Sequence, residues 1–376
     1  MSSPARAAAM LGAIVVAAGV FAGWPRLETA PYSVAVTRDS AIVCEVRHGH
    51  VEKREVTGLS PGAEHSVTMD SGRPASFRTA REPGEGFTFV VIGDSGVTKD
   101  IKDAPTPTAR QRTLCELMVA ARPDFVVHVG DIEYYHSERL EYGDQFFAPY
   151  GPLLSRCALF PTPGNHDTRD RYASAYYELF PQGGPTHENR FYSFDWGAVH
   201  FVSLDGSDDE LPADHPQYAW LERDLAAVPA DRGIVIFQHF PIYSSGRHGM
   251  FVDSPGVGKR LLPYLRRFGV GLFLCGHDHD YERSHPVEGG TTFVVSGGGG
   301  GELNQPSKEH PCGWSIDPPP AWSAARALRY HFTKLAVAPD GRSAALEAID
   351  RDGQVFDRAT VALRYSPAAG GAGSSR

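Results

Sequence analysis

The sequence predicts an α/β protein preceded by a short all-β region, and three observations support this prediction. Continuous apolar segments such as 87–92 and 125–129 alternate with an amphipathic stretch at 108–122, a pattern typical of buried strands separated by helices. Before them, residues 31–80 contain only short alternating apolar runs between turn residues, which indicates antiparallel strands. Polar clusters follow the continuous apolar segments, and open α/β sheets build their binding sites at such positions.

The all-β region is short for an independent domain. Apolar residues alternate around Val34, Ile42 and Phe77, with Gly, Pro and Asp in the turns between them. A stretch of about fifty residues is half of an immunoglobulin-like domain. We therefore expect residues 31–80 to form an abbreviated β-sandwich that packs on its neighbour, with residues 81–85 (Arg-Glu-Pro-Gly-Glu) as a linker.

The α/β domain is predicted to occupy residues 86–366. Its further elements are strands at 234–237 and 272–274, helices at 217–228 and 259–268, a hairpin of 331–338 with 344–350, and a last strand at 355–365. Pro263 is expected to interrupt the second of these helices. Residues 367–376 are rich in Gly, Ala and Ser and offer little to pack, so they are predicted to be a disordered tail.

The N-terminus carries an apolar segment. Residues 7–24 contain no charged side chain and follow Arg6, which is typical of a secretory signal with Val20–Ala22 as the cleavage site. Its 18 residues also reach the lower limit for a membrane-spanning helix. The sequence therefore predicts an exported protein (secreted, periplasmic or in the cell envelope) whose residues 1–24 are either a cleaved signal peptide or an uncleaved membrane anchor.

Composition and charge exclude several classes of protein. Hydrophobic residues make up 41% and charged residues 22% of the chain, as in an ordinary globular protein. Lys and Arg number 36 against 45 Asp and Glu, a formal net charge of −9, so nucleic acid is not expected as a bound partner. The 5 cysteines are scattered, which excludes a disulfide scaffold or a thiolate zinc site. None of these features predicts a particular oligomeric state.

Five polar clusters follow apolar stretches in order along the chain. They are Gly93-Asp94-Ser95-Gly96, Gly130-Asp131-Ile132-Glu133-Tyr134, Gly164-Asn165-His166-Asp167, Gln238-His239 and Gly276-His277-Asp278-His279. A single Gly-Asp after a strand is usually a turn, and a single loop Asn usually satisfies backbone groups. Five such clusters at successive strand ends indicate a metal site instead.

The residue types in these clusters suit a centre of two metal ions. Asp, Asn, His and Tyr offer oxygen and nitrogen ligands for Fe, Mn or Zn. Two cations about 3.5–4 Å apart can generate a hydroxide and clamp a phosphoryl group for in-line attack. A carboxylate can bridge both ions through its two oxygens, and Asp131 is the candidate bridge, with Asp94 bound to one ion only.

The clusters GDSG, GDIEY, GNHD, QH and GHDHDYER span residues 93–283. In this order they resemble the motifs of the calcineurin-like metallophosphoesterases, and within that superfamily those of purple acid phosphatases. Most of the superfamily carries Asp-x-His in the first motif, but here Gly96 stands in place of the His. Tyr134, three residues after Asp131, is similar to the phenolate ligand that replaces it in purple acid phosphatases. The resemblance implies an αββα sandwich over 86–366, preceded by a small fibronectin-III-like module.

The same resemblance implies roles for individual residues. Fe(III) would be bound by Asp94, Asp131, Tyr134 and His279. A divalent Zn, Mn or Fe ion would be bound by Asp131, Asn165, His239 and His277. His166 would lie near the substrate and stabilise developing charge or protonate the leaving oxygen. His248 would contact the phosphate, the alternative being an exposed loop histidine.

Three acidic residues depart from the pattern of the purple acid phosphatases. Asp167 stands where Glu is common, and Asp278 and Asp280 replace apolar or small residues around the last histidine pair. For Asp278 and Asp280 we expect solvated loop positions, with an altered metal preference as the alternative.

The sequence therefore predicts an exported acid phosphatase that hydrolyses small phosphomonoesters by attack of a metal-bound hydroxide. A phosphodiesterase acting on nucleotide or phospholipid headgroup diesters is the first alternative, because the same centre can cleave both ester classes. A non-catalytic envelope protein that keeps its metals for structure is the second. The presence of seven metal-ligating side chains together with His166 disfavours it.

Overall fold

The structure is a computed structural model. It describes residues 27–97, 109–134, 139–169, 174–182, 190–206, 211–254, 257–307 and 311–366. The predicted signal or anchor segment and the predicted tail lie outside these residues. Among the described residues, no helix is long and apolar enough to cross a membrane.

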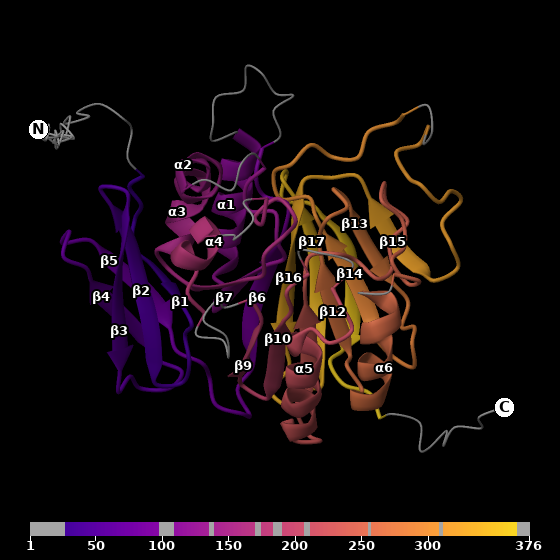
Figure 1. Cartoon of the computed structure of the whole chain (residues 1–376), viewed down its shortest axis with the longest axis horizontal. Coiled ribbons are helices and arrows are strands. Elements are labelled where there is room, and N and C mark those ends of the chain that lie inside the picture. Colours follow the sequence, from indigo (N-terminus) through magenta and orange to yellow (C-terminus); the bar gives the residue numbers. More distant parts are fainter. Residues whose placement is uncertain are drawn as a thin grey trace, which may run out of the picture.

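Two β-sheets packed face to face form the centre of the molecule (Figure 1). The larger sheet has nine strands in the order β18-β17-β16-β6-β7-β8-β1-β2-β3. In chain order these are β1 (Tyr32–Val34), β2 (Ser40–Arg47), β3 (His50–Thr57), β6 (Phe87–Ile92), β7 (Phe125–His128), β8 (Ala158–Pro161), β16 (His331–Val337), β17 (Ser343–Asp350) and β18 (Val355–Ala362).

The smaller sheet has seven strands in the order β15-β13-β14-β12-β11-β10-β9. These are β9 (Tyr192–Trp196), β10 (Val199–Ser203), β11 (Gly233–Phe237), β12 (Leu272–Cys275), β13 (Tyr281–Ser284), β14 (Thr292–Ser296) and β15 (Ser323–Ala327). The remaining strands β4 (Glu64–Thr68) and β5 (Pro74–Arg78) pair only with each other.

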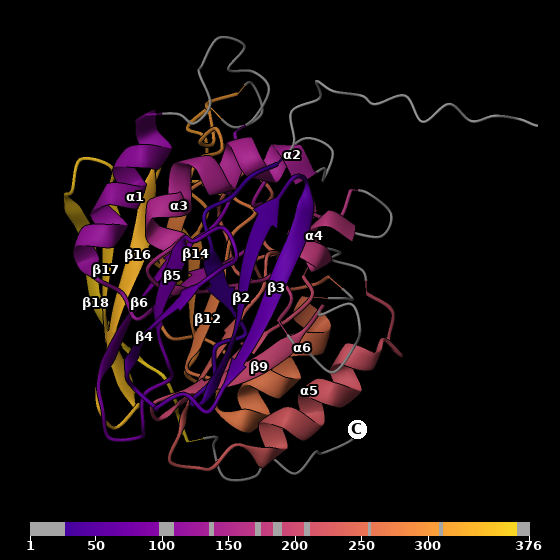
Figure 2. The same ribbon diagram turned by 90° about the vertical axis from the view of Figure 1, so that its left-hand side faces the viewer.

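Helices cover the outer face of each sheet. The helices against the larger sheet are α1 (Ala109–Ala121), α2 (Arg139–Tyr142), α3 (Ala148–Leu154) and α4 (Ser174–Leu179), with a π-helical turn (Gly143–Phe147) between α2 and α3. Those against the smaller sheet are α5 (Pro216–Ala227) and α6 (Gly258–Phe268), which lie side by side (Figure 2). Separate apolar clusters join each helical layer to its sheet. The predicted αββα fold is therefore confirmed.

Aromatic side chains fill the space between the two sheets. Phe89 of β6 stacks on Phe125 of β7 with ring centroids 5.1 Å apart, and Phe201 of β10 meets Phe125 edge to face at 5.4 Å. Phe160 of β8 stacks on Phe194 of β9 at 3.7 Å. Such close-packed rings fix the separation and alignment of the sheets, so the loops at the strand ends start from a rigid support.

The N-terminal region is all-β, as predicted, and it joins the larger sheet directly. β1 pairs in parallel with β8, so β1, β2 and β3 extend the sheet that also contains β6 and β7 (Figure 1). Arg81 donates two hydrogen bonds to Asp124 Oδ1 (3.0 and 2.8 Å), which ties the connecting segment to the residue before β7. The division of the chain at residues 81–85 stays a prediction.

Most predicted elements of the α/β part form within a few residues of their expected bounds, but α6 differs in one respect. It continues through Pro263 instead of being interrupted there. Leu261, Leu262 and Leu265 are buried against the smaller sheet, and this packing outweighs the single backbone hydrogen bond that a proline removes. The sequence prediction missed β9, β10, β13, β14 and β15, although β10 and β14 contain apolar runs typical of buried strands.

An ion-pair cluster around the largely buried His200 of the smaller sheet gives the fold a pH-dependent stability. His200 of β10 contacts Asp195 Oδ1 through Nδ1 at 2.8 Å and Asp224 Oδ2 through Nε2 at 2.9 Å. Burial alone would lower the pKa of His200, but the hydrogen bonds to Asp195 and Asp224 raise it to about 9. Because this value lies above that of an unfolded histidine, the stabilisation is complete below about pH 6.5 and is lost as the pH rises through 9.

We therefore expect the free energy of unfolding to fall by on the order of 2–3 kcal/mol between pH 6 and pH 9.5 because of this cluster. The measurement is urea unfolding at both pH values for the wild type and for His200→Gln, which cannot become charged. The difference between the two proteins isolates His200 from other titrating groups. An equal fall in both proteins would contradict the assignment.

Candidate metal centre

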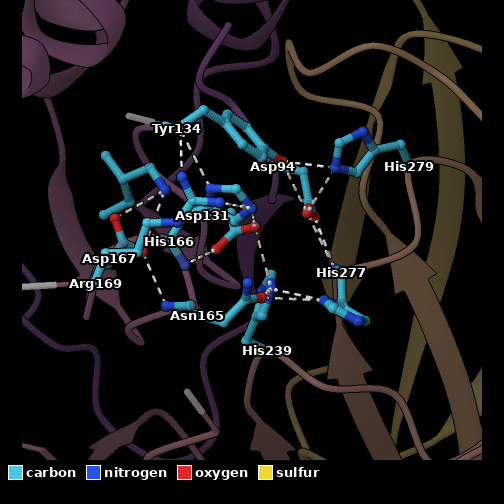
Figure 3. Close-up of polar contacts among 12 residues, drawn as sticks. Asp94, Asp131, Tyr134, Asn165, His166, Asp167, Arg169, His239, His277 and His279 are labelled. Carbon is cyan, nitrogen blue, oxygen red and sulfur yellow. Dashed lines mark hydrogen bonds and ion pairs between the residues drawn. The ribbon is translucent and has the colours of Figure 1, made fainter. Parts of the chain in front are cut away.

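The predicted ligands lie where strands of both sheets end (Figure 3). In the larger sheet β6, β7 and β8 are parallel neighbours, so Asp94, Asp131 and Asn165, which follow them, lie at one edge. In the smaller sheet β11 and β12 are also parallel. The residues that follow these two strands are His239, His277 and His279.

The backbone bends sharply at both aspartates. Asp94 has φ 53° and Asp131 has φ 54°, a left-handed conformation that is uncommon for residues other than glycine and often found at functional sites. Neighbouring hydrogen bonds hold the bends, because Asp94 N–H donates to Gly130 O at 2.9 Å and Ser95 N–H donates to Asp131 O at 3.0 Å. Gly164 allows the next loop to approach, since a Cβ there would lie 2.3 Å from Asp131 N.

One group of ligand atoms forms around Asn165. Its Oδ1 lies 3.1 Å from His239 Nε2 and 3.2 Å from His277 Nδ1. His239 Nε2 in turn lies 3.4 Å from Asp131 Oδ2. The structure therefore brings together the four residues that the sequence predicted for the divalent ion.

A second group forms around Tyr134. Its Oη lies 2.7 Å from His279 Nε2 and 3.2 Å from Asp94 Oδ1, and His279 Nε2 lies 3.5 Å from Asp94 Oδ1. The backbone N–H of His277 donates to both oxygens of Asp94 at 3.1 and 3.0 Å, which connects the two groups. Asp94, Asp131 and His239 each offer one ligand atom within 4.8 Å of the others.

Backbone carbonyls orient the histidines toward the centre. His239 Nδ1 donates to Val129 O at 2.9 Å, and His279 Nδ1 donates to Glu302 O at 2.5 Å. Nε2 of each ring therefore faces the site: that of His239 meets the oxygens of Asn165 and Asp131, and that of His279 meets the Tyr134 hydroxyl. This convergence of imidazoles and carboxylates fits metal ions.

Burial makes the negative charge of Asp94 costly without such ions, whereas at Asp131 the effect of burial is outweighed by His239 and His166, which lower its pKa. The pKa of Asp94 is raised well above its usual value by burial, with Asp131 acting in the same direction and His239 opposing. Burial also raises the pKa of the Tyr134 hydroxyl, and the nearby carboxylates of Asp94 and Asp131 add to the effect. A phenolate at Tyr134 therefore needs a compensating cation.

The family model described as calcineurin-like phosphoesterase matches residues 87–281, more than half of the chain. The chain belongs to the calcineurin-like phosphoesterase family. Human (Homo sapiens) acid phosphatase type 7 is 28% identical over 352 residues, which cover 82% of this chain and 76% of that protein. A nucleotide pyrophosphatase/phosphodiesterase from Hordeum vulgare is 26% identical over 338 residues, or 78% of this chain and 88% of that protein.

The fold of this phosphoesterase is similar to that of a purple acid phosphatase from yellow lupin (Lupinus luteus) seeds. The TM-score is 0.72 with 21% sequence identity, over 91% of this chain and 75% of the lupin chain. Together with the family and the acid phosphatase relatives, this similarity confirms the resemblance to purple acid phosphatases. The protein is a metal-dependent phosphoric ester hydrolase.

Asp167 of this phosphoesterase holds the loops of the site together. It is fully buried, and its carboxylate accepts hydrogen bonds from Gly164 N–H at 2.8 Å, Ile132 N–H at 3.1 Å and the Tyr142 hydroxyl at 3.1 Å. Since Ile132 follows Asp131, this one side chain links the loop after β8 to the loop after β7. Asp167 therefore supports the ligands without pointing at them.

His166 and Arg169 lie next to Tyr134 (Figure 3), and Arg169 is exposed. The backbone N–H of His166 donates to Asp131 Oδ1 at 2.9 Å, and its Nε2 is 3.9 Å from Asp131 Oδ2. Arg169 donates to Tyr134 O and approaches His166 Nε2, both at 3.3 Å. The sequence prediction missed Arg169, although its place three residues after His166 was the available signal.

His248 lies beside the centre, and its contact with a phosphate stays a prediction. Its ring centroid is 4.2 Å from that of His277, while 42% of its side chain is exposed. The expectation for Asp278 and Asp280 was wrong, because both are fully buried. Residues 244–246, together with Asn304, contact these carboxylates and cover them, and this packing has no signal in the local sequence.

Replacing Gly164 should damage the centre. In Gly164→Ala the new methyl group would overlap the backbone and side chain of Asp131, so the loop must move away. We expect the free energy of unfolding to fall by about 1–3 kcal/mol. We also expect the protein to bind less metal when the metal concentration is limiting. Thermal unfolding and elemental analysis measure the two effects. Gly151→Ala is the matched control, since a Cβ there meets nothing within 4 Å; equal results for both variants would contradict the prediction.

Proposed function

We propose that this phosphoesterase is an exported acid phosphatase that hydrolyses small phosphomonoesters at a binuclear centre of Fe(III) and a divalent Zn, Mn or Fe ion. The observation that carries the proposal is the presence of two adjacent ligand groups, one around Asn165 and one around Tyr134. The acid phosphatase relatives support the reaction, and the uncharged N-terminal segment supports export.

The donor atoms support different ions in the two groups. The phenol of Tyr134 with two carboxylates, Asp94 and Asp131, and one imidazole, His279, suits a hard trivalent ion. An amide oxygen, two imidazoles and the shared Asp131 suit a divalent ion. Ions held there would lower the pKa of a bound water and neutralise the charge on the phosphoryl oxygens.

The protein's own side chains would orient the substrate and handle protons. His166 Nδ1 lies 3.3 Å from Tyr134 O, and donation to this carbonyl directs Nε2 toward the centre, 3.3 Å from Arg169 Nη2 and 3.9 Å from Asp131 Oδ2. Burial lowers the pKa of His166, with Arg169 acting in the same direction and Asp131 opposing. Delivery of a proton from Nε2 to the leaving oxygen therefore favours an acidic medium.

Positive charge at the exposed side would attract the anionic substrate. Arg169 flanks the centre, and ions at the centre would reverse the local effect of a chain whose formal net charge is −9. The acidic total charge therefore does not oppose a phosphate ester as the substrate.

Cleavage of phosphodiesters is the second candidate activity. It is favoured by the similarity to the Hordeum vulgare protein named a nucleotide pyrophosphatase/phosphodiesterase and by the exposed Arg169, which could contact a second charged group. Rates on 4-nitrophenyl phosphate and bis(4-nitrophenyl) phosphate under one set of conditions decide between the two. A higher kcat/KM for the diester would overturn the monoester assignment.

Loss of the shared carboxylate should abolish hydrolysis. We expect Asp131→Ala to lower kcat/KM for 4-nitrophenyl phosphate by about 10³-fold or more, because both ions lose a ligand. Asp214→Ala is the control, because it removes an exposed carboxylate that belongs to neither ligand group, and it should leave the rate unchanged. Wild-type protein that is inactive with every combination of Fe, Zn and Mn would refute the proposed activity.

The ferric site has a spectroscopic signature of its own. A phenolate bound to Fe(III) absorbs visible light, so the iron-loaded protein should be coloured, and Tyr134→Phe should lose the band while keeping the fold. The measurement is the visible spectrum of both proteins at equal iron content. A band that persists in Tyr134→Phe would show that Tyr134 is not the iron ligand.

A further inference from the structure

The segment between the two last histidine ligands carries a buried carboxylate that faces away from the ligand groups. Asp278 stands between His277 and His279 in the chain, yet its side chain contacts the segment 244–248, which follows β11. It is fully buried. A buried carboxylate needs hydrogen bonds or an opposite charge, and its hydrogen bonds come from that segment.

Three contacts join Asp278 to residues 244–248. The Ser244 hydroxyl donates to Oδ2 at 2.5 Å, and the backbone N–H of His248 donates to Oδ1 at 2.9 Å. The His248 imidazole Nδ1 lies within ion-pair distance of the same Oδ1, at 3.4 Å. Gly246 allows the backbone of this segment to approach the Asp278 carboxylate closely, because a Cβ at this position would lie only 2.5 Å from Asp278 Cγ.

These contacts fix both the main chain and the ring of His248. The ring lies over His277 with centroids 4.2 Å apart and planes tilted by 31°. Because Nδ1 faces Asp278, Nε2 is the nitrogen left for a ligand. An exposed histidine would otherwise sample several rotamers, and holding it in one of them reduces the entropy lost when it engages a substrate.

We propose that Asp278 is a positioning residue that holds His248 over His277, so that Nε2 of His248 contacts the phosphate of the substrate. This inference rests on the proposed function for the identity of the substrate, but not for the geometry. It gives the Asp in the Gly-His-Asp-His motif a role distinct from metal binding. The two histidines of the motif belong to the ligand groups, and the aspartate between them orients a third histidine.

A double-mutant cycle on the metal-loaded full chain tests the coupling. Asp278→Ala is expected to lower kcat/KM for 4-nitrophenyl phosphate about tenfold in the wild-type background and less than about twofold in a His248→Ala background. Asp278→Asn keeps the volume and one acceptor oxygen, so it should show a smaller loss that also disappears with His248→Ala. Equal losses in both backgrounds would overturn the positioning role.

Two further measurements separate this role from a structural one. The metal content of every variant should equal that of the wild type. If Asp278→Ala binds less metal, the double-mutant cycle that combines Asp278→Asn with His248→Ala decides whether Asp278 acts through His248. Ser245→Ala is the matched control, because Ser245 lies in the same segment but bonds to Glu282 rather than Asp278. It should change kcat/KM by less than about twofold, and a loss as large as that of Asp278→Ala would overturn the proposal.

Binding of inorganic phosphate keeps the test independent of the proposed reaction. The dissociation constant, measured by calorimetry on the metal-loaded protein, should show the same coupling between Asp278 and His248 as kcat/KM. If the wild type fails to hydrolyse the ester but the phosphate cycle shows coupling, the proposed function fails and the positioning role stands. If the wild type is active and both cycles are additive, only the positioning role fails.

Discussion

The metal centre depends on the alignment of two sheet edges, because neither sheet contains a complete ligand group. Asn165 and Asp131 follow strands of the larger sheet, whereas His239 and His277 follow strands of the smaller one. The group around Tyr134 is divided in the same way, with His279 coming from the smaller sheet. Any slip between the sheets would separate donors that now lie 2.7–3.5 Å apart. The aromatic packing between the sheets is therefore a condition of the chemistry.

A second constraint is electrostatic. Asp94 and Asp131 are buried close to each other, and each offers a ligand atom within 4.8 Å of His239. Burial raises the pKa of Asp94, so its negative charge is costly without a bound cation, and metal binding and the stability of this region are expected to be linked. Two kinds of support resist the repulsion. Backbone carbonyls fix the rings of His239 and His279, and Asp167 gathers the backbone N–H groups of the neighbouring loops.

The same principle extends to the substrate side. His166 is tied to Asp131 through its backbone, and His248 is tied to Asp278. Each candidate substrate histidine is therefore anchored to an aspartate within or beside the metal motifs. A shift of the metal ligands would move both histidines with them, which suits a reaction whose rate depends on sub-ångström positioning.

The sequence by itself determined the α/β class, the order of the main strands and the identity of the candidate ligands, because each is encoded locally. Apolar runs mark buried strands, and a Gly-Asp or Gly-Asn-His cluster stands directly after its strand. Tertiary structure decided which of these clusters meet, since Asp94 and His279 are far apart in the chain and come together only through the packing of two sheets. It also decided that β1 joins β8, that α6 tolerates Pro263, and that Asp278 and Asp280 are buried. A polar residue in a loop has the same local pattern whether water or another segment covers it, so its burial depends on which segment folds over it.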